Sequence, residues 1–262
     1  MKPNVAIKRS VDVAMYILFL LLMGQCVLRG AVHEWLGISA GILFLIHNAL
    51  NYKWYCTLLK GKYNAMRMVQ LVVNALLFLA MLACMIGGLL VSQHIFAIGN
   101  GSAIEFGRHL HLVATAWAFI LMSIHLGLHG SIFVEGVKKI HADERIKKAV
   151  HLICRVVIAA LCAYGLYQFV DRRFWEELFH LVDYQKEYDY SKSLVPYFAE
   201  SAVLSALFIT ISYYAKKILL KASAQRNSYE LASFYCSALC SWGDARRYRM
   251  AIRMLRTMHQ TV

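Results

Sequence analysis

Six long apolar segments constrain the fold of this chain more than any other feature. A helix needs roughly 20 predominantly apolar residues to cross a bilayer, and most of the segments approach or exceed that length. The second segment is the shortest, and it can span only if its polar ends, His33 and Asn51, are included. We therefore predict an all-α integral membrane protein with six transmembrane helices, in the segments 11–28, 35–50, 69–91, 110–133, 149–170 and 196–220.

The composition agrees with a membrane protein. Hydrophobic residues make up 60% of the chain and charged residues only 16%. Ordinary soluble domains have roughly 45–50% apolar residues and about 25% charged residues. The composition therefore argues against a soluble fold.

Lysine and arginine residues fall mainly on one side of the predicted helices. Three lie in residues 1–10, four in 52–67, five in 134–149 and nine from Lys216 onward. The opposite side holds only Arg29, Arg108, Arg172, Arg173, Lys186 and Lys192. Because basic loops remain in the cytoplasm, we expect both termini there. The net charge of +13 then reflects topology, and since no nucleic-acid motif accompanies it, we expect no nucleic-acid partner.

Four histidines form two matching pairs in the second and fourth segments. His33 and His47 are 14 residues apart, and so are His111 and His125. Fourteen residues make almost four helical turns, so each pair shares one helix face, with its members about 21 Å apart along the axis. Both segments run inward, so we expect His33 and His111 at the outer level and the other two at the inner level.

Paired imidazoles at two depths are the ligands expected for two haems. Two imidazoles per iron leave no open position, which suits electron transfer rather than oxygen chemistry. We therefore predict two b-type haems, one at each level, with these four histidines as the iron ligands. None of the seven cysteines forms a C-x-x-C-H attachment site, so the haems are expected to be held without covalent bonds.

Several neighbouring residues are weaker candidates for binding the same cofactors. Arg108 lies three residues before His111, where a cation would offset the charge of a haem propionate. His129 lies one turn beyond His125 and could bond a propionate or a quinone, or serve only at the membrane interface. His109 is the alternative outer ligand. Small residues would let a porphyrin approach the backbone, or favour ordinary helix contact: Gly37, Ala40, Gly41, Ala114, Thr115 and Ala118.

The chain divides into three parts on this interpretation. Residues 1–133 form the haem-binding bundle, and residues 134–220 add two helices joined by an outer loop at 171–195. That loop is rich in aromatic and acidic residues, and is either a docking surface or an interfacial helix. Residues 221–262 form a basic tail, which is expected to lie on membrane lipid or against an acidic partner.

Three stretches around the histidines resemble a known family. They are HEWLG at 33–37, HNALNYKWY at 47–55 and RHLHLVATAWAFILMSIHLGLHG at 108–130. These stretches closely resemble the flavinylation-associated cytochrome family, which are cytochrome b-like bacterial membrane proteins often linked with extracytoplasmic flavin-carrying domains. The resemblance covers the second to fourth helices best and does not extend to the tail.

The resemblance implies a cytochrome b-like bundle formed by the first four helices, with the four paired histidines binding two haems. It also implies a bacterial cytoplasmic membrane and a redox partner on the outer face. This chain has no flavin-attachment motif of the D-x-x-S-G-A-T type. Any covalent flavin is therefore expected on another polypeptide.

Three functions follow from these observations as hypotheses. The leading one is a di-haem b-type cytochrome, an electron-transfer subunit rather than a stand-alone enzyme. It would carry electrons between a quinol or cytoplasmic donor and an extracytoplasmic flavin or iron–sulfur partner. The second is a quinol-oxidising membrane anchor subunit, with a quinone near His129. The third is a non-redox transporter or scaffold whose histidines bind a metal ion or a proton.

Overall fold

The computed structural model describes residues 3–24, 28, 30–61, 63–130, 144–179 and 194–240. Its described part contains helices and no strand, as the all-α prediction required. Each predicted apolar segment overlaps one long helix. The helices are α1 (Pro3–Met23), α2 (Ala31–Leu50), α3 (Tyr52–Thr57), α4 (Ala65–Val91), α5 (Gly101–His129), α7 (Glu144–Asp171), α8 (Phe174–Leu178) and α9 (Leu194–Cys240).

Four of these helices are long and apolar enough to cross a membrane. They are α4, α5, α7 over Arg145–Asp171 and α9 over Phe198–Arg226, which indicates a multi-pass membrane protein. The sequence predicted six spans, but α1 and α2 are not apolar enough to count among these four. The reason is that Lys8, Arg9 and Asp12 lie in the first half of α1, while α2 has polar residues at both ends.

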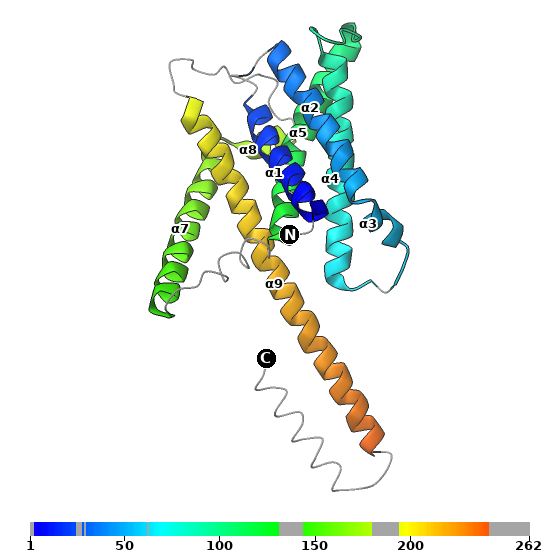
Figure 1. The fold of residues 1–262 in the computed structure, drawn as a ribbon, viewed down its shortest axis with the longest axis vertical. Helices are drawn as coiled ribbons and strands as arrows, with labels where there is room; N and C mark the ends of the chain where they lie inside the picture. The colour runs from blue at the N-terminus through cyan, green and yellow to red at the C-terminus, as the bar shows by residue number, and fades with distance from the viewer. Residues whose placement is uncertain are drawn as a thin grey trace.

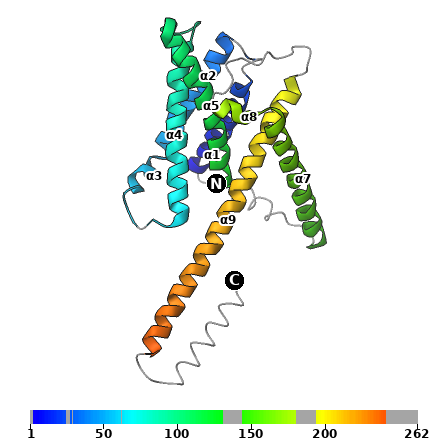
Figure 2. The same cartoon turned by 180° about the vertical axis from the view of Figure 1, so that it is seen from behind.

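The long helices form a bundle that α9 closes (Figures 1 and 2). Helix α2 contacts α1 and α4, α4 packs along α5, and α9 packs on α5 and also reaches α1 and α4. Helix α7 lies on the outside of the bundle against α9. The sequence predicted a haem-binding bundle made by the first four helices and left the contacts of the last two helices open. In the structure the last long helix is part of it as well.

Close contact between backbones explains why α9 joins the bundle. A Cβ atom placed on Gly127 of α5 would lie 1.9 Å from Ser212 Oγ and 2.3 Å from the Ile209 carbonyl oxygen of α9. Only glycine fits at this crossing. Small residues at helix crossings are the usual means by which membrane helices pack tightly.

The most deeply buried side chains lie between α1, α5, α8 and α9. The core includes Phe19, Ala118, Phe119, Phe174 and Leu204, each at most 6% exposed. A short polar network crosses it, in which the Ser123 and Ser205 hydroxyls are 2.9 Å apart and Tyr16 donates to Ser205 Oγ at 3.1 Å. These helices are therefore held together by their own side chains.

Helix α2 is less tightly held. It packs against α1 and α4, but its backbone hardly approaches that of α5. In Figure 1 the two helices run in the same direction, from the upper end of the bundle towards the lower end. This parallel arrangement puts corresponding residues of α2 and α5 at similar depths.

Helix α9 continues beyond the other described helices, and its last part extends below the bundle (Figure 1). The helix is continuous from Leu194 to Cys240, so it includes the first part of the predicted basic tail at 221–262. Most of the predicted outer loop, at 180–193, lies outside the described residues. So does the amphipathic stretch of the tail beyond residue 240.

Candidate functional site: two histidine levels

The structure brings His33 and His111 together at one end of the bundle. Their ring centroids are 6.2 Å apart, and the two ring planes are nearly perpendicular at 80°. His33 comes from the first turn of α2 and His111 from the first half of α5. We call these two residues the outer pair.

The centroid distance of the outer pair is compatible with two imidazoles that share one metal atom. Two imidazoles joined by a direct N–H···N bond of about 2.9 Å would have centroids about 5 Å apart, since each centroid lies about 1 Å behind its nitrogen. Two bonds of about 2 Å to a shared metal give about 6 Å instead. The observed distance of 6.2 Å is close to the second value, and it also lies within the ordinary range of edge-to-face ring contacts.

A backbone group orients the His111 ring. Its Nδ1 lies 2.8 Å from the carbonyl oxygen of Cys84 in α4, with the Cys84 Sγ 3.6 Å away. A carbonyl oxygen can only accept a hydrogen bond, so Nδ1 must carry the proton. The lone pair of Nε2 is then available to a metal.

His33 lacks such a partner. Its Nδ1 is buried and has no hydrogen-bond partner among the described residues. An unsatisfied buried nitrogen costs on the order of 1–3 kcal/mol. An added Cβ on Gly37, one turn further along α2, would meet nothing within 4 Å. The outer pair thus includes a buried nitrogen without a described hydrogen-bond partner, and there is open space at Gly37, one turn away.

The inner pair consists of His47 of α2 and His125 of α5, and each has a side-chain partner. His47 Nδ1 is 2.7 Å from Asp12 Oδ1 of α1, and His125 Nδ1 is 2.8 Å from Asn74 Oδ1 of α4. Both contacts again place the proton on Nδ1 and leave Nε2 to a metal.

More polar groups gather at the inner end of the bundle. His129 is exposed, and its ring centroid lies 4.7 Å from that of His125. Lys8 donates to Asn51 Oδ1 at 3.1 Å, and Lys216 donates to the Leu128 carbonyl at 2.6 Å. The charges of α1 and α9 at this depth therefore point towards polar partners inside the protein.

The ligand set suits haem better than a bare metal ion. Within the described ranges, no three His, Cys, Asp or Glu side chains come together as a metal site. A tetrahedral zinc site needs three or four protein ligands. Haem iron takes four of its bonds from the porphyrin, so two facing imidazoles complete its coordination.

The weaker candidates occupy different surroundings. Arg108 is exposed on α5, one turn before His111. His109, the alternative outer ligand, is two residues from His111, and it is His111 whose ring faces His33. Ala114 and Ala118 are 6% and 0% exposed, so they serve helix packing rather than a cofactor cradle.

Glu34 joins the first turn of α2, ahead of the apolar segment 35–50, to the loop after α4. Its carboxylate accepts a hydrogen bond from Ser92 Oγ at 2.7 Å and others from the backbone N–H groups of Gln93, His94 and Ile95. The carboxylate thus holds the outer end of α2 in place.

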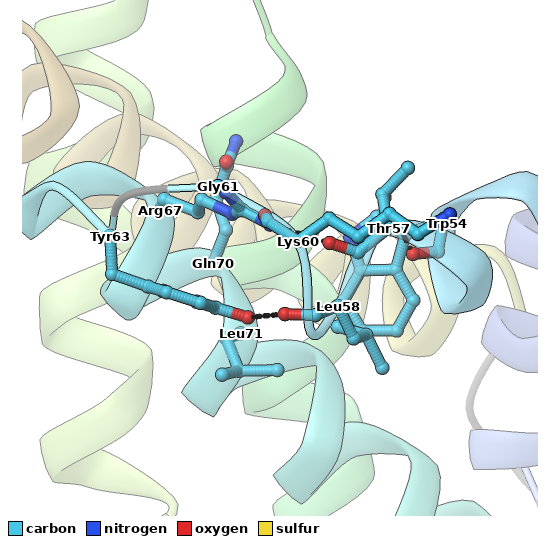
Figure 3. Close-up of a pocket in the computed structure, with 9 residues that line it drawn as sticks. All are labelled: Trp54, Thr57, Leu58, Lys60, Gly61, Tyr63, Arg67, Gln70 and Leu71. Carbon is cyan, nitrogen blue, oxygen red and sulfur yellow. Dashed lines mark hydrogen bonds between the residues drawn. The ribbon is translucent and has the colours of Figure 1, made fainter.

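A cavity of about 460 Å³ lies beside α3, away from both histidine pairs (Figure 3). Arg67 crosses it and donates to the carbonyl oxygens of Thr57 and Lys60 at 2.6 Å, while its guanidinium carbon lies 4.2 Å from the Tyr63 ring centroid. Tyr63 also donates to the Leu58 carbonyl. The basic side chain of Arg67 therefore braces the turn between α3 and α4.

Sequence reasoning missed the partners of the histidines. Asp12 and Asn74 are polar residues inside helices α1 and α4, and that is the signal that could have found them, because such groups are costly in a membrane without a partner. The Cys84 carbonyl has no sequence signal, because every residue carries a backbone carbonyl.

Comparisons with protein-family models, with curated proteins and with solved structures find no match for this chain.

Proposed function

We propose that this protein is a di-haem b-type cytochrome that carries electrons across the bacterial cytoplasmic membrane. His33 and His111 hold the outer haem, and the inner pair holds the second. The observation that carries the proposal is the outer pair, with its centroids 6.2 Å apart and a buried Nδ1 without a partner among the described residues. Bound haem would supply one-electron chemistry, and the chain supplies the ligands, their orientation and an apolar surrounding.

Helices α1 and α2 belong to the membrane-embedded part in this proposal, which then has six spans. The polar groups that lower their hydropathy have partners within the bundle, as in the contacts of Asp12 with His47 and of Lys8 with Asn51. Paired polar groups are tolerated at membrane depth far better than isolated ones. The distribution of basic residues puts both termini in the cytoplasm.

The protein works as an electron-transfer subunit with an outer redox partner. The resemblance to the flavinylation-associated cytochrome family supports an extracytoplasmic partner that carries flavin or an iron–sulfur cluster. The inner donor is a quinol or a cytoplasmic protein.

Haem content tests the proposal directly. The full chain, expressed with ample haem and purified in detergent, should contain about two haems per polypeptide and show a b-type reduced-minus-oxidised spectrum. His47→Ala should lose mainly the inner haem and keep the outer one. Purified protein without haem, or with a spectrum that His47→Ala does not change, would contradict the proposal.

Quinol oxidation is the second candidate function, and one observation favours it. The exposed ring of His129 lies 4.7 Å from that of the inner ligand His125, where it could take a proton from a bound quinol. His129→Ala should then slow haem reduction by quinol while both haems stay bound. His151→Ala, a change at an exposed histidine of α7, is the matched control and should leave quinol-driven reduction unaltered. Unchanged reduction in His129→Ala excludes this role.

A further inference from the structure

The inner pair differs from the outer pair in having a carboxylate against one of its rings. Asp12 Oδ1 lies 2.7 Å from His47 Nδ1. The acceptors for the other partnered ligands are neutral, the Cys84 carbonyl for His111 and the Asn74 amide for His125, each at 2.8 Å. Among the four ligand histidines, the described contacts thus give a charged acceptor only to His47.

A charged acceptor changes the ligand as well as orienting it. A hydrogen bond from imidazole to a carboxylate is roughly twice as strong as one to a neutral oxygen. It draws the proton away from the ring, which makes Nε2 a stronger electron donor to a metal. Stronger donation and a nearby negative charge both favour the oxidised, more positive state of an iron centre.

The other charges near the two levels do not act through a ligand. Lys8 and Lys216 lie at the inner end and oppose Asp12, but the hydrogen bonds described for them go to Asn51 and to the Leu128 carbonyl. Glu34 is adjacent to His33 in sequence, yet its oxygens accept from Ser92 and from the loop that follows α4. Among the residues that the structure describes, the Asp12 carboxylate alone is hydrogen-bonded to a ligand ring.

We propose that Asp12 is a positioning residue that sets the reduction potential of the inner haem below that of the outer haem. Transfer of one electron at a time from the inner level to the outer level is then the downhill direction. This inference rests on the proposed function, because it requires haem at both levels. It adds a direction of flow, from the cytoplasmic side outward.

The test is a redox titration of the haem-loaded full chain, followed by optical absorbance. The wild-type protein should show two one-electron transitions, and the His33→Ala variant, which keeps the inner haem, identifies the lower one. Asp12→Asn should move that lower transition to a more positive potential and leave the upper one unchanged. Glu34→Gln makes the same chemical change beside the outer pair and should leave the lower transition where it is.

The outcomes separate this inference from the proposed function. A chain without haem contradicts the proposed function. Two haems with an inner transition that Asp12→Asn does not move, or moves to a more negative potential, contradict the inference alone. If Asp12→Asn fails to retain the inner haem, the two reduction potentials of the wild-type protein provide the test. An inner potential equal to or above the outer one overturns the proposal.

Discussion

The two histidine levels have the same pair of side chains but obtain their support from different sources. At the outer level, His111 is oriented by a backbone carbonyl, and the buried Nδ1 of His33 has no partner among the described residues. At the inner level, both rings are oriented by side chains, Asp12 and Asn74. One chain can thus place identical ligand sets in different electrostatic surroundings. The properties of each level are then set by helices that carry no ligand.

Removing a ligand gives the largest expected effect and separates the levels. His111→Ala should lose the outer haem and His125→Ala the inner one, so that each variant holds about one haem instead of about two, because one imidazole seldom retains a b-type haem. His109→Ala is the control for His111→Ala and should keep both. Haem quantification checks this. Loss of both haems in each variant would mean that the two levels are not independent.

Changing the partners should distinguish side-chain from backbone support. Asn74→Leu removes the acceptor of His125, so we expect affinity for the inner haem to fall about 10–100-fold. Cys84→Ala leaves the carbonyl that orients His111 and should retain the outer haem. Haem retention during titration with a haem-binding competitor measures both effects. Equal losses in the two variants would contradict the comparison.

A small steric change should affect the outer level alone. A Cβ atom on Gly88 of α4 would lie 3.3 Å from the His111 ring atoms Cε1 and Nδ1. That is tight enough for the ring to shift by a few tenths of an ångström. Gly88→Ala should therefore alter the electron paramagnetic resonance signal of the outer oxidised haem and not that of the inner one. A changed signal from the inner haem, with an unchanged signal from the outer haem, would contradict this prediction.

Loss of the Glu34 charge should weaken the outer end of α2. Its carboxylate accepts hydrogen bonds from Ser92 Oγ and from the backbone N–H groups of Gln93, His94 and Ile95. Glu34→Gln removes the charge that strengthens these hydrogen bonds, so the variant should unfold at a lower temperature than wild type near neutral pH. Thermal unfolding measures this. A variant as stable as wild type would show that these hydrogen bonds do not hold the outer end of α2.

Much of this arrangement was predictable because helices impose a simple periodicity. The 14-residue spacings of His33–His47 and His111–His125 required only that each segment be helical and that the two run in parallel. The apolar segments likewise predicted the long helices. Their ends were less predictable: α5 begins at Gly101, well before the apolar segment at 110, because hydrogen bonding continues past the residues that lipid would cover.

The contacts between helices could not be predicted in the same way. Gly127 and Ser212 meet because the backbones of α5 and α9 approach closely, and nothing in the order of the segments indicates that the last long helix joins the first four. Asp12 pairs with His47 for a similar reason. Its partner is 35 residues away in sequence, and only the packing of α1 on α2 brings the two together.

The weak attachment of α2 to α5 affects how the protein assembles. Helices α4, α5 and α9 pack through their own side chains, whereas the ring contact described between α2 and α5 is that of the outer pair. A ligand held by this pair would bind only when α2 is in place. By mass action it would add its binding free energy to the stability of that arrangement. Insertion of such a ligand and the docking of α2 would then occur together, as one final folding step.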